Sequence, residues 1–293
     1  MPDNEGTSAQ AKTARAKAVG ALLPALHELL HVTDLKWDDT QKDYRLLVIN
    51  HVIRRQLEAI EAALSLGTVG LGHLSVAFIR TALEEMLWTK FLAGLPLATS
   101  QRLLLTLANY DSLRSLAAQR EFIGDEEMRS LWYTPAFLDA AQQRLTFVET
   151  DLKALQQELK WSGKTPSAEW IAKSINEMRT YRYLHSATSR SVHFSAGEAF
   201  RRSWGAPGGI VTTDKPEFRV HLYEFALDQL WRLLMSTMEG SMELISEAGI
   251  MSKDSLTEER LLPRVKAVLE LNRVPLVHAH EWNLTPEGPL RFP

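Results

Sequence analysis

The sequence predicts an all-α fold, a multi-helix bundle with long antiparallel helices. Apolar residues recur at the spacing of a helix, rather than that of a strand, over almost the whole chain. Short connections that contain glycine or proline separate these periodic stretches, and short connections favour antiparallel neighbours. Of the 293 residues, 45% are hydrophobic and 24% are charged, so the chain can bury a sizeable core.

Four helices are expected in the first part of the chain, at residues 9–31, 39–67, 73–93 and 100–122. The second begins after Asp38 or Asp39, which are acidic N-cap candidates, and ends at Gly67. Its apolar stripe consists of Leu46, Ile49, Ile53, Leu57, Ile60 and Leu64. Gly94 and Pro96 end the third helix, because neither residue type continues a helix well.

The later helices are expected at residues 135–159, 168–175, 176–192, 218–248 and 256–271. Ser167 is the expected N-cap of the helix at 168–175, and Pro263 should kink or restart the last helix. A short β-hairpin is expected near 208–220, because the run from Ile210 to Thr213 is β-branched and flanked by turn residues.

Three segments follow from this pattern: a flexible N-terminal tail (1–15), a single helical-bundle domain (16–272) and an irregular C-terminal tail (273–293).

The first fifteen residues lack the apolar run of a secretory signal, and no run approaches the roughly 20 residues of a membrane span. The chain has no cysteine, which excludes disulfides, a thiolate nucleophile and sulfur-ligated metal sites. We therefore expect a cytoplasmic protein that has no membrane partner, metal or cofactor.

Two polar residues stand out in the segment 77–88 of the helix expected at 73–93, which is otherwise rich in apolar residues. Arg80 and Glu84 lie one turn apart and can pair on the same side of that helix. Because the surrounding residues are apolar, the pair is expected to be at least partly buried. Two interpretations remain open: an internal ion pair that sets helix register, or an Arg80 that holds an anion while Glu84 orients a histidine.

A basic, histidine-bearing helix is the second candidate. Tyr181, His185, Ser189 and His193 recur every four residues and would form one polar stripe. Residues 173–202 contain six basic and two acidic residues, a local charge of +4 in a chain of net charge −3. Positive surroundings favour neutral histidine, which suits a general base near pH 7. Arginines suit phosphate or carboxylate ligands, and those named here are Arg179, Arg182 and Arg190. The alternative is a solvated basic helix face.

Two short stretches resemble a bacterial all-helical family of unknown function. One is the helix with Arg80 and Glu84, and the other runs from Tyr181 to Ser195 and contains the segment Val-His-Phe-Ser around His193. The resemblance covers about the middle half of the chain. It implies a helical fold and directs attention to Arg80, Glu84 and His193, but it implies no chemistry.

Arg179 and His185, with five residues between them, resemble the signature of the HEPN superfamily, which is an arginine, four to six residues and then a histidine on a late helix. The helical bundles of this superfamily include metal-independent RNases of toxin and antiviral systems. The resemblance implies that His185 activates a ribose 2′-hydroxyl and that Arg179 stabilises the phosphorane, in a site shared across a homodimer. Thr180 departs from the family pattern at the position after the arginine. The competing hypothesis is a non-catalytic module that binds RNA, another anionic ligand or a partner's acidic segment.

Overall fold

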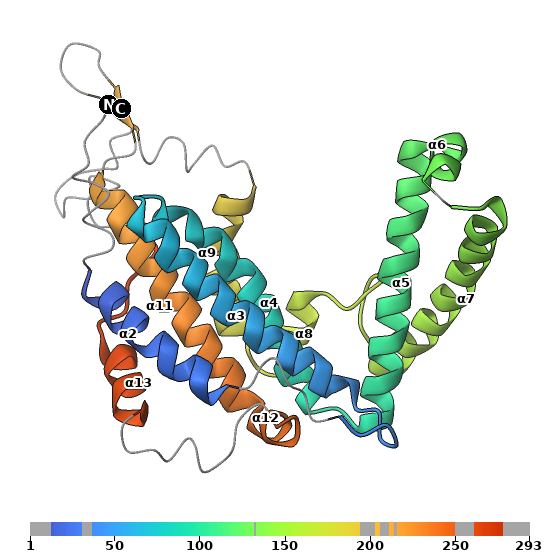
Figure 1. The fold of residues 1–293 in the computed structure, drawn as a ribbon, viewed down its shortest axis with the longest axis horizontal. Helices are drawn as coiled ribbons and strands as arrows, with labels where there is room; N and C mark the ends of the chain where they lie inside the picture. The colour runs from blue at the N-terminus through green and yellow to red at the C-terminus, as the bar shows by residue number, and fades with distance from the viewer. Residues whose placement is uncertain are drawn as a thin grey trace.

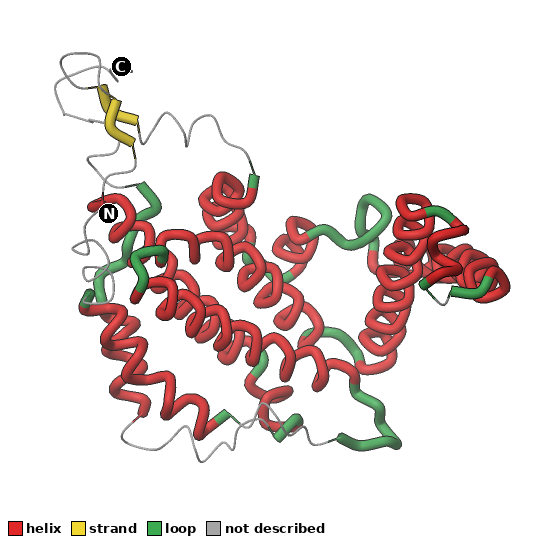
Figure 2. The backbone as a smooth tube through the Cα atoms, turned by 45° about the horizontal axis from the view of Figure 1, so that its top comes forward, coloured by secondary structure: helices red, strands yellow, loops and turns green. Residues whose placement is uncertain are grey.

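The computed structural model describes residues 13–30, 37–131, 133–193, 203–205, 211–213, 216–249 and 261–277, and over these it confirms the predicted helical bundle (Figures 1 and 2). Its longer helices are α2 (Ala14–Leu29), α3 (Tyr44–Thr68), α4 (Val76–Ala93), α5 (Leu97–Ile123), α7 (Pro135–Leu159), α9 (Met178–Val192), α11 (Pro216–Gly240) and α13 (Leu261–Glu270). Short helices are η1 (Gly72–Ser75), α6 (Asp125–Ser130), α8 (Ala168–Ser174) and α12 (Met242–Glu247).

Helix α11 forms the centre of the bundle. It packs against α4 and α3, which lie beside it in Figure 1, and α2 also contacts it. Fourteen of its residues are buried, so it has no fully polar face. A helix that is apolar on most sides is stable only where other helices surround it. Helix α4, which packs against α11, also packs against α9, so the two helices with predicted site residues are in contact.

Two glycines, one near the end of α3 and one at the start of η1, allow the turn between α3 and α4 to pack closely against α11. A β-carbon at Gly67 or Gly72 would lie 2.5 or 2.4 Å from the ring of Tyr223, which is too close for any side chain. These glycines occur in the segment from Gly67 to Gly72, which connects two helices. They serve close packing around a buried tyrosine.

Helices α5 and α7 pack against each other as an arm that extends away from the bundle, with α6 at its tip (Figure 1). The start of α5 contacts α3, so the arm begins at the bundle. Helix α6, which follows Gly124, was not predicted as a separate helix. The return of α7 brings the loop at 160–167 and then α8 back against α4.

Several boundaries differ from the predicted ones. Helix α3 begins at Tyr44, because Asp43, rather than Asp38 or Asp39, accepts the capping hydrogen bond from the backbone of Arg45. The predicted helix at 218–248 is divided into α11 and α12 at Ser241. Ser167 caps α8 as predicted, by accepting a hydrogen bond from the Trp170 amide.

The short β-hairpin lies at 203–213, so its predicted position near 208–220 is wrong in part. Strands β1 (Ser203–Gly205) and β2 (Val211–Thr213) pair antiparallel, with Trp204 opposite Thr212 (Figure 2). Residues 216–220 belong instead to α11, which begins two residues before the predicted start at Phe218, with Pro216 and Glu217, residue types that suit the first turn of a helix. None of the described helices is long and apolar enough to cross a membrane.

Candidate functional site

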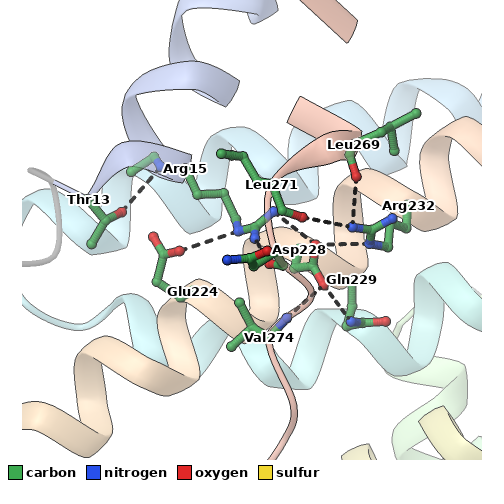
Figure 3. Close-up of polar contacts among 11 residues, drawn as sticks. Thr13, Arg15, Glu224, Asp228, Gln229, Arg232, Leu269, Leu271 and Val274 are labelled. Atoms are coloured by element: carbon green, nitrogen blue, oxygen red, sulfur yellow. Dashed lines mark hydrogen bonds and ion pairs between the residues drawn. The ribbon is translucent and has the colours of Figure 1, made fainter. Parts of the chain in front are cut away.

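A buried ionic network joins α2, α11 and the segment that follows α13 (Figure 3). Asp228 is 1% exposed and accepts hydrogen bonds from Arg15 and Arg232, each at 2.9 Å. It also accepts bonds from the Gln229 side chain at 3.0 Å and from the backbone amide of Val274 at 3.4 Å. A buried charge is tolerated when it is paired and hydrogen-bonded in this way.

This network fixes the chain after α13 as well as the helices. The guanidinium of Arg15 donates to the carbonyl of Asn272 at 2.6 Å, and Arg232 donates to the carbonyls of Leu269 and Leu271 at 3.1 and 3.4 Å. His221 bonds to the carbonyl of Pro275 at 2.7 Å. Residues 272–275, which the sequence places at the boundary of an irregular tail, are thus held against α11.

A cavity of about 860 Å³ lies where α9, α11 and this held segment meet. We call it the α9–α11 cavity. Its polar lining residues are Arg179, Thr180, Tyr183, Gln229, Arg232, Ser236, Glu239 and Arg273. Its volume is within the range of small-molecule sites, which is roughly 300–1,000 Å³.

The α9–α11 cavity has an excess of positive charge. Arg232 is paired with Asp228, whereas Arg179 and Arg273 have no acidic partner among the described residues. Glu239 is the one carboxylate in its lining. Unpaired guanidinium groups in a concave site are suited to phosphate or carboxylate, which they bind through two parallel hydrogen bonds.

Tyr183 places an aromatic ring and a hydroxyl beside these arginines. Burial raises the pKa of Tyr183, while a hydrogen bond with the backbone of Leu276 and the charge of Arg273 oppose that shift. The phenol is therefore neutral at physiological pH and can donate a hydrogen bond. Its side of α9 faces the held segment, which brings Arg273 within electrostatic range.

His185 occupies a different position on α9, next to the predicted pair on α4. Arg80 and Glu84 form an ion pair at 2.5 Å, and both are half-buried, as the sequence predicts. The Tyr181 and His185 rings lie 4.9 Å apart. Burial and then Arg80 lower the pKa of His185, whereas Glu84 and Glu169 oppose this effect. The neutral imidazole is therefore favoured at pH 7.

The remaining predicted residues lie along or just beyond α9. The side chain of Arg182 is exposed and that of Ser189 is half-buried, while the side chain of Arg190 lies outside the described residues. Because α9 ends at Val192, His193 leaves the helical stripe; it is exposed, and its backbone amide donates to the carbonyl of Ser189 at 3.0 Å. His193 is one of the charges that lower the pKa of His185.

Arg179 and His185 face different sides of α9. Six residues of helix rotate by about 120° in net direction, at about 100° per residue. Arg179 lines the α9–α11 cavity, whereas the charged groups that act on His185 are Arg80, Glu84, Glu169 and His193. Within one chain, His185 lies near Arg80, whereas Arg179 lines the same cavity as Arg273.

The sequence interpretation did not identify Arg232, Arg273 or Tyr183. Arg232 is four residues after Asp228 on a very apolar helix, which is a signal for a buried ion pair. Arg273 gives no such signal, because only the fold brings the chain after α13 back to α9.

No protein-family model, curated protein or solved structure matches the chain. Among the described residues, no group of three or more histidine and acidic side chains is placed to hold a metal ion.

Proposed function

We propose that this protein is a binding module for a phosphate-bearing ligand of about nucleotide size, held in the α9–α11 cavity. The observation that supports this most strongly is that two guanidinium groups line the same cavity without an acidic partner in the described part of the chain. They belong to Arg179 and Arg273. They approach one cavity from α9, which packs against α4, and from the chain after α13, which the Asp228 network holds against α11. Arginines without an acidic partner bind an anion without first giving up such a partner.

The ligand would be recognised by more than its charge. Tyr183, which is 47% exposed, offers a ring against which a base can stack. Thr180, whose hydroxyl donates to Glu177, and Ser236 line the same cavity. A mononucleotide or the end of an RNA strand carries the phosphate and the aromatic base that this lining fits.

RNA cleavage is a second proposal, and it rests on His185. The neutral imidazole has the protonation state of a general base, and Arg80 is the arginine beside it. Cleavage by the pair Arg179 and His185 needs both groups at one phosphate, which requires either a second protomer or a bridging strand. The geometry of a single chain therefore supports binding better than cleavage.

Titration calorimetry with 5′-AMP tests the binding proposal. We expect wild type to bind, and Arg179→Ala and Arg273→Ala each to weaken binding by about tenfold or more, since a charged hydrogen bond contributes about 1.5–3 kcal/mol. Arg182→Ala is the matched control, because Arg182 is exposed on the same helix and does not line the cavity. Equal losses in all three variants, or no binding by wild type, would contradict the proposal.

Incubation of the pure protein with a labelled RNA oligonucleotide separates the two proposals. Binding with intact RNA supports the module. Cleavage that His185→Ala abolishes, while AMP binding persists, would make the RNase the better description.

A further inference from the structure

A second concave site lies on another side of the bundle, between α3, α4 and the beginning of the arm. This α3–α4–α5 cleft has a volume of about 500 Å³. Its floor is apolar and includes Val52, Leu92 and Leu104, and the indole of Trp88 lines it as well. The loop after α7 closes one end with Thr165 and Pro166.

One carboxylate in this cleft has too few partners. The side chain of Glu85 is 12% exposed, and its nearest ionic neighbour is Arg55, at 3.2 Å from Oε1. Oε1 is buried, and because the contact with Arg55 lacks hydrogen-bond geometry, this oxygen accepts no hydrogen bond from any described residue. Burial raises the pKa of Glu85 to about 7, and the charge of Arg55 offsets only part of this effect. A buried acceptor without a donor is destabilising, so the Glu85 carboxylate favours a ligand that donates a hydrogen bond.

The other charges in the cleft favour a cation. Asp111, on α5, has no basic partner among the described residues, and Glu84 adds a second carboxylate whose charge Arg80 balances. Arg55 is the one arginine in the lining and already faces Glu85. Burial lowers the pKa of His51, and the charges of Arg55 and Arg54 lower it further, so His51 adds no positive charge at pH 7.

The indole of Trp88 belongs to a chain of packed aromatic rings. The ring of Trp88 packs edge-on against Phe91 at 6.1 Å, and Phe91 packs against Trp170 at 5.3 Å. Trp170 in turn contacts Trp161 at 6.0 Å. An indole held in this way offers both an apolar surface and a site for a cation over its ring.

We propose that the α3–α4–α5 cleft binds a small organic amine, in which the ammonium group bonds to Glu85 and an apolar body packs on Trp88. The ammonium donates a hydrogen bond to the Glu85 carboxylate, and Asp111 supports its charge. This site is independent of the phosphate site, since the two cavities share no lining residue.

Calorimetry with 2-phenylethylamine as the probe tests this inference, with 2-phenylethanol and phenylacetate as neutral and anionic counterparts. We expect the amine to bind about tenfold more tightly than the alcohol, and the acid not to bind. Glu85→Gln should remove the preference for the amine, whereas Glu58→Gln, at an exposed carboxylate of α3, should keep it. Equal binding of amine and alcohol to wild type, or a retained preference in Glu85→Gln, would overturn the proposal.

The protonation of Glu85 provides a readout that needs no variant. A bound cation favours the carboxylate, so at pH 7 binding should release protons, which is measured in two buffers of different ionisation enthalpy. The groups that face Glu85 are His51 and Arg55 on α3, Glu84 on α4 and Asp111 on α5. The affinity should rise about tenfold from pH 6 to pH 8, as Glu85 with its pKa of about 7 loses its proton. Binding without proton release would contradict the role of Glu85.

Discussion

Two carboxylates on the inner helices, Asp228 and Glu85, have opposite surroundings. Asp228 accepts four hydrogen bonds, two of them from arginines, and it connects α2, α11 and the chain after α13. Glu85 faces one half-exposed arginine and has a buried oxygen with no donor. Complete pairing makes the first carboxylate part of the architecture. Incomplete pairing leaves the second with a capacity to bind a ligand or a proton.

The largest expected effect is at the fully paired carboxylate. Asp228→Asn leaves two arginines facing a neutral amide in a buried site, so we expect a loss of about 3–5 kcal/mol in unfolding free energy. Urea denaturation measures this loss. Asp111→Asn is the matched control, since that carboxylate is exposed, and it should change stability by less than about 0.5 kcal/mol. Equal effects of the two substitutions would remove the distinction between the sites.

The arginine that pairs with Asp228 should contribute more to stability than the arginine that pairs with Glu85. Arg15 is 3% exposed and bonds to Glu224, Asp228 and Asn272, so Arg15→Gln should cost about 2–4 kcal/mol. The side chain of Arg55 is 46% exposed, and its pair is therefore screened by water, so Arg55→Gln should cost no more than about 1 kcal/mol. Urea midpoints of the two variants check this ranking. A larger loss at Arg55 would show that its pair with Glu85 is structural.

Glu85 itself should destabilise the protein above neutral pH. Its pKa of about 7 lies above the ordinary value of 4.5. Between pH 4.5 and pH 7 the carboxyl group of Glu85 is therefore mostly protonated in the folded state and mostly ionised in the unfolded state. Stability therefore falls as pH rises from about 4.5 to 7, and the penalty is complete above pH 7. Glu85→Gln removes this penalty. We expect it to stabilise the protein by about 3 kcal/mol at pH 8 and by almost nothing at pH 4.5.

Melting temperatures of wild type and Glu85→Gln across this pH range measure the difference. Glu58→Gln, at an exposed position on α3, should show no such pH dependence. A variant that is less stable than wild type at pH 8 would mean that Arg55 compensates fully for the burial of Glu85.

Periodicity predicts the helices well, because each long helix has a continuous apolar stripe that must be buried. It fails where a single residue decides the outcome. Asp43 caps α3 although Asp38 and Asp39 are chemically equivalent candidates, and Ser241 interrupts a pattern that remains apolar beyond it. The hairpin was expected too far along the chain because β-branched residues mark only its second strand.

The candidate sites are less predictable, because they depend on tertiary neighbours. The sequence singles out Arg80, Glu84 and His185, and the structure brings them together at the contact of α4 and α9. It does not single out Glu85, which follows Glu84 but points about 100° further around α4, toward Arg55. Nor does it connect Arg179 with Arg273, which are close only because the Asp228 network holds the chain after α13 against α11.

The smallest effect on stability is expected at Arg179 and Arg273, the two arginines of the α9–α11 cavity that lack an acidic partner among the described residues. Arg179 and Arg273 are exposed and make no ion pair with a described residue, so replacing either with alanine should change unfolding free energy by less than about 0.5 kcal/mol. Removing two like charges from one cavity should even relieve repulsion. The double variant is therefore expected to unfold at the same urea concentration as wild type while it no longer gains stability from AMP. For wild type, a ligand at 100 times its dissociation constant adds about 2.7 kcal/mol. A double variant that is markedly unstable without ligand would show that these arginines belong to the architecture, as Arg15 does, and that the contrast between paired and unpaired charges does not extend to this cavity.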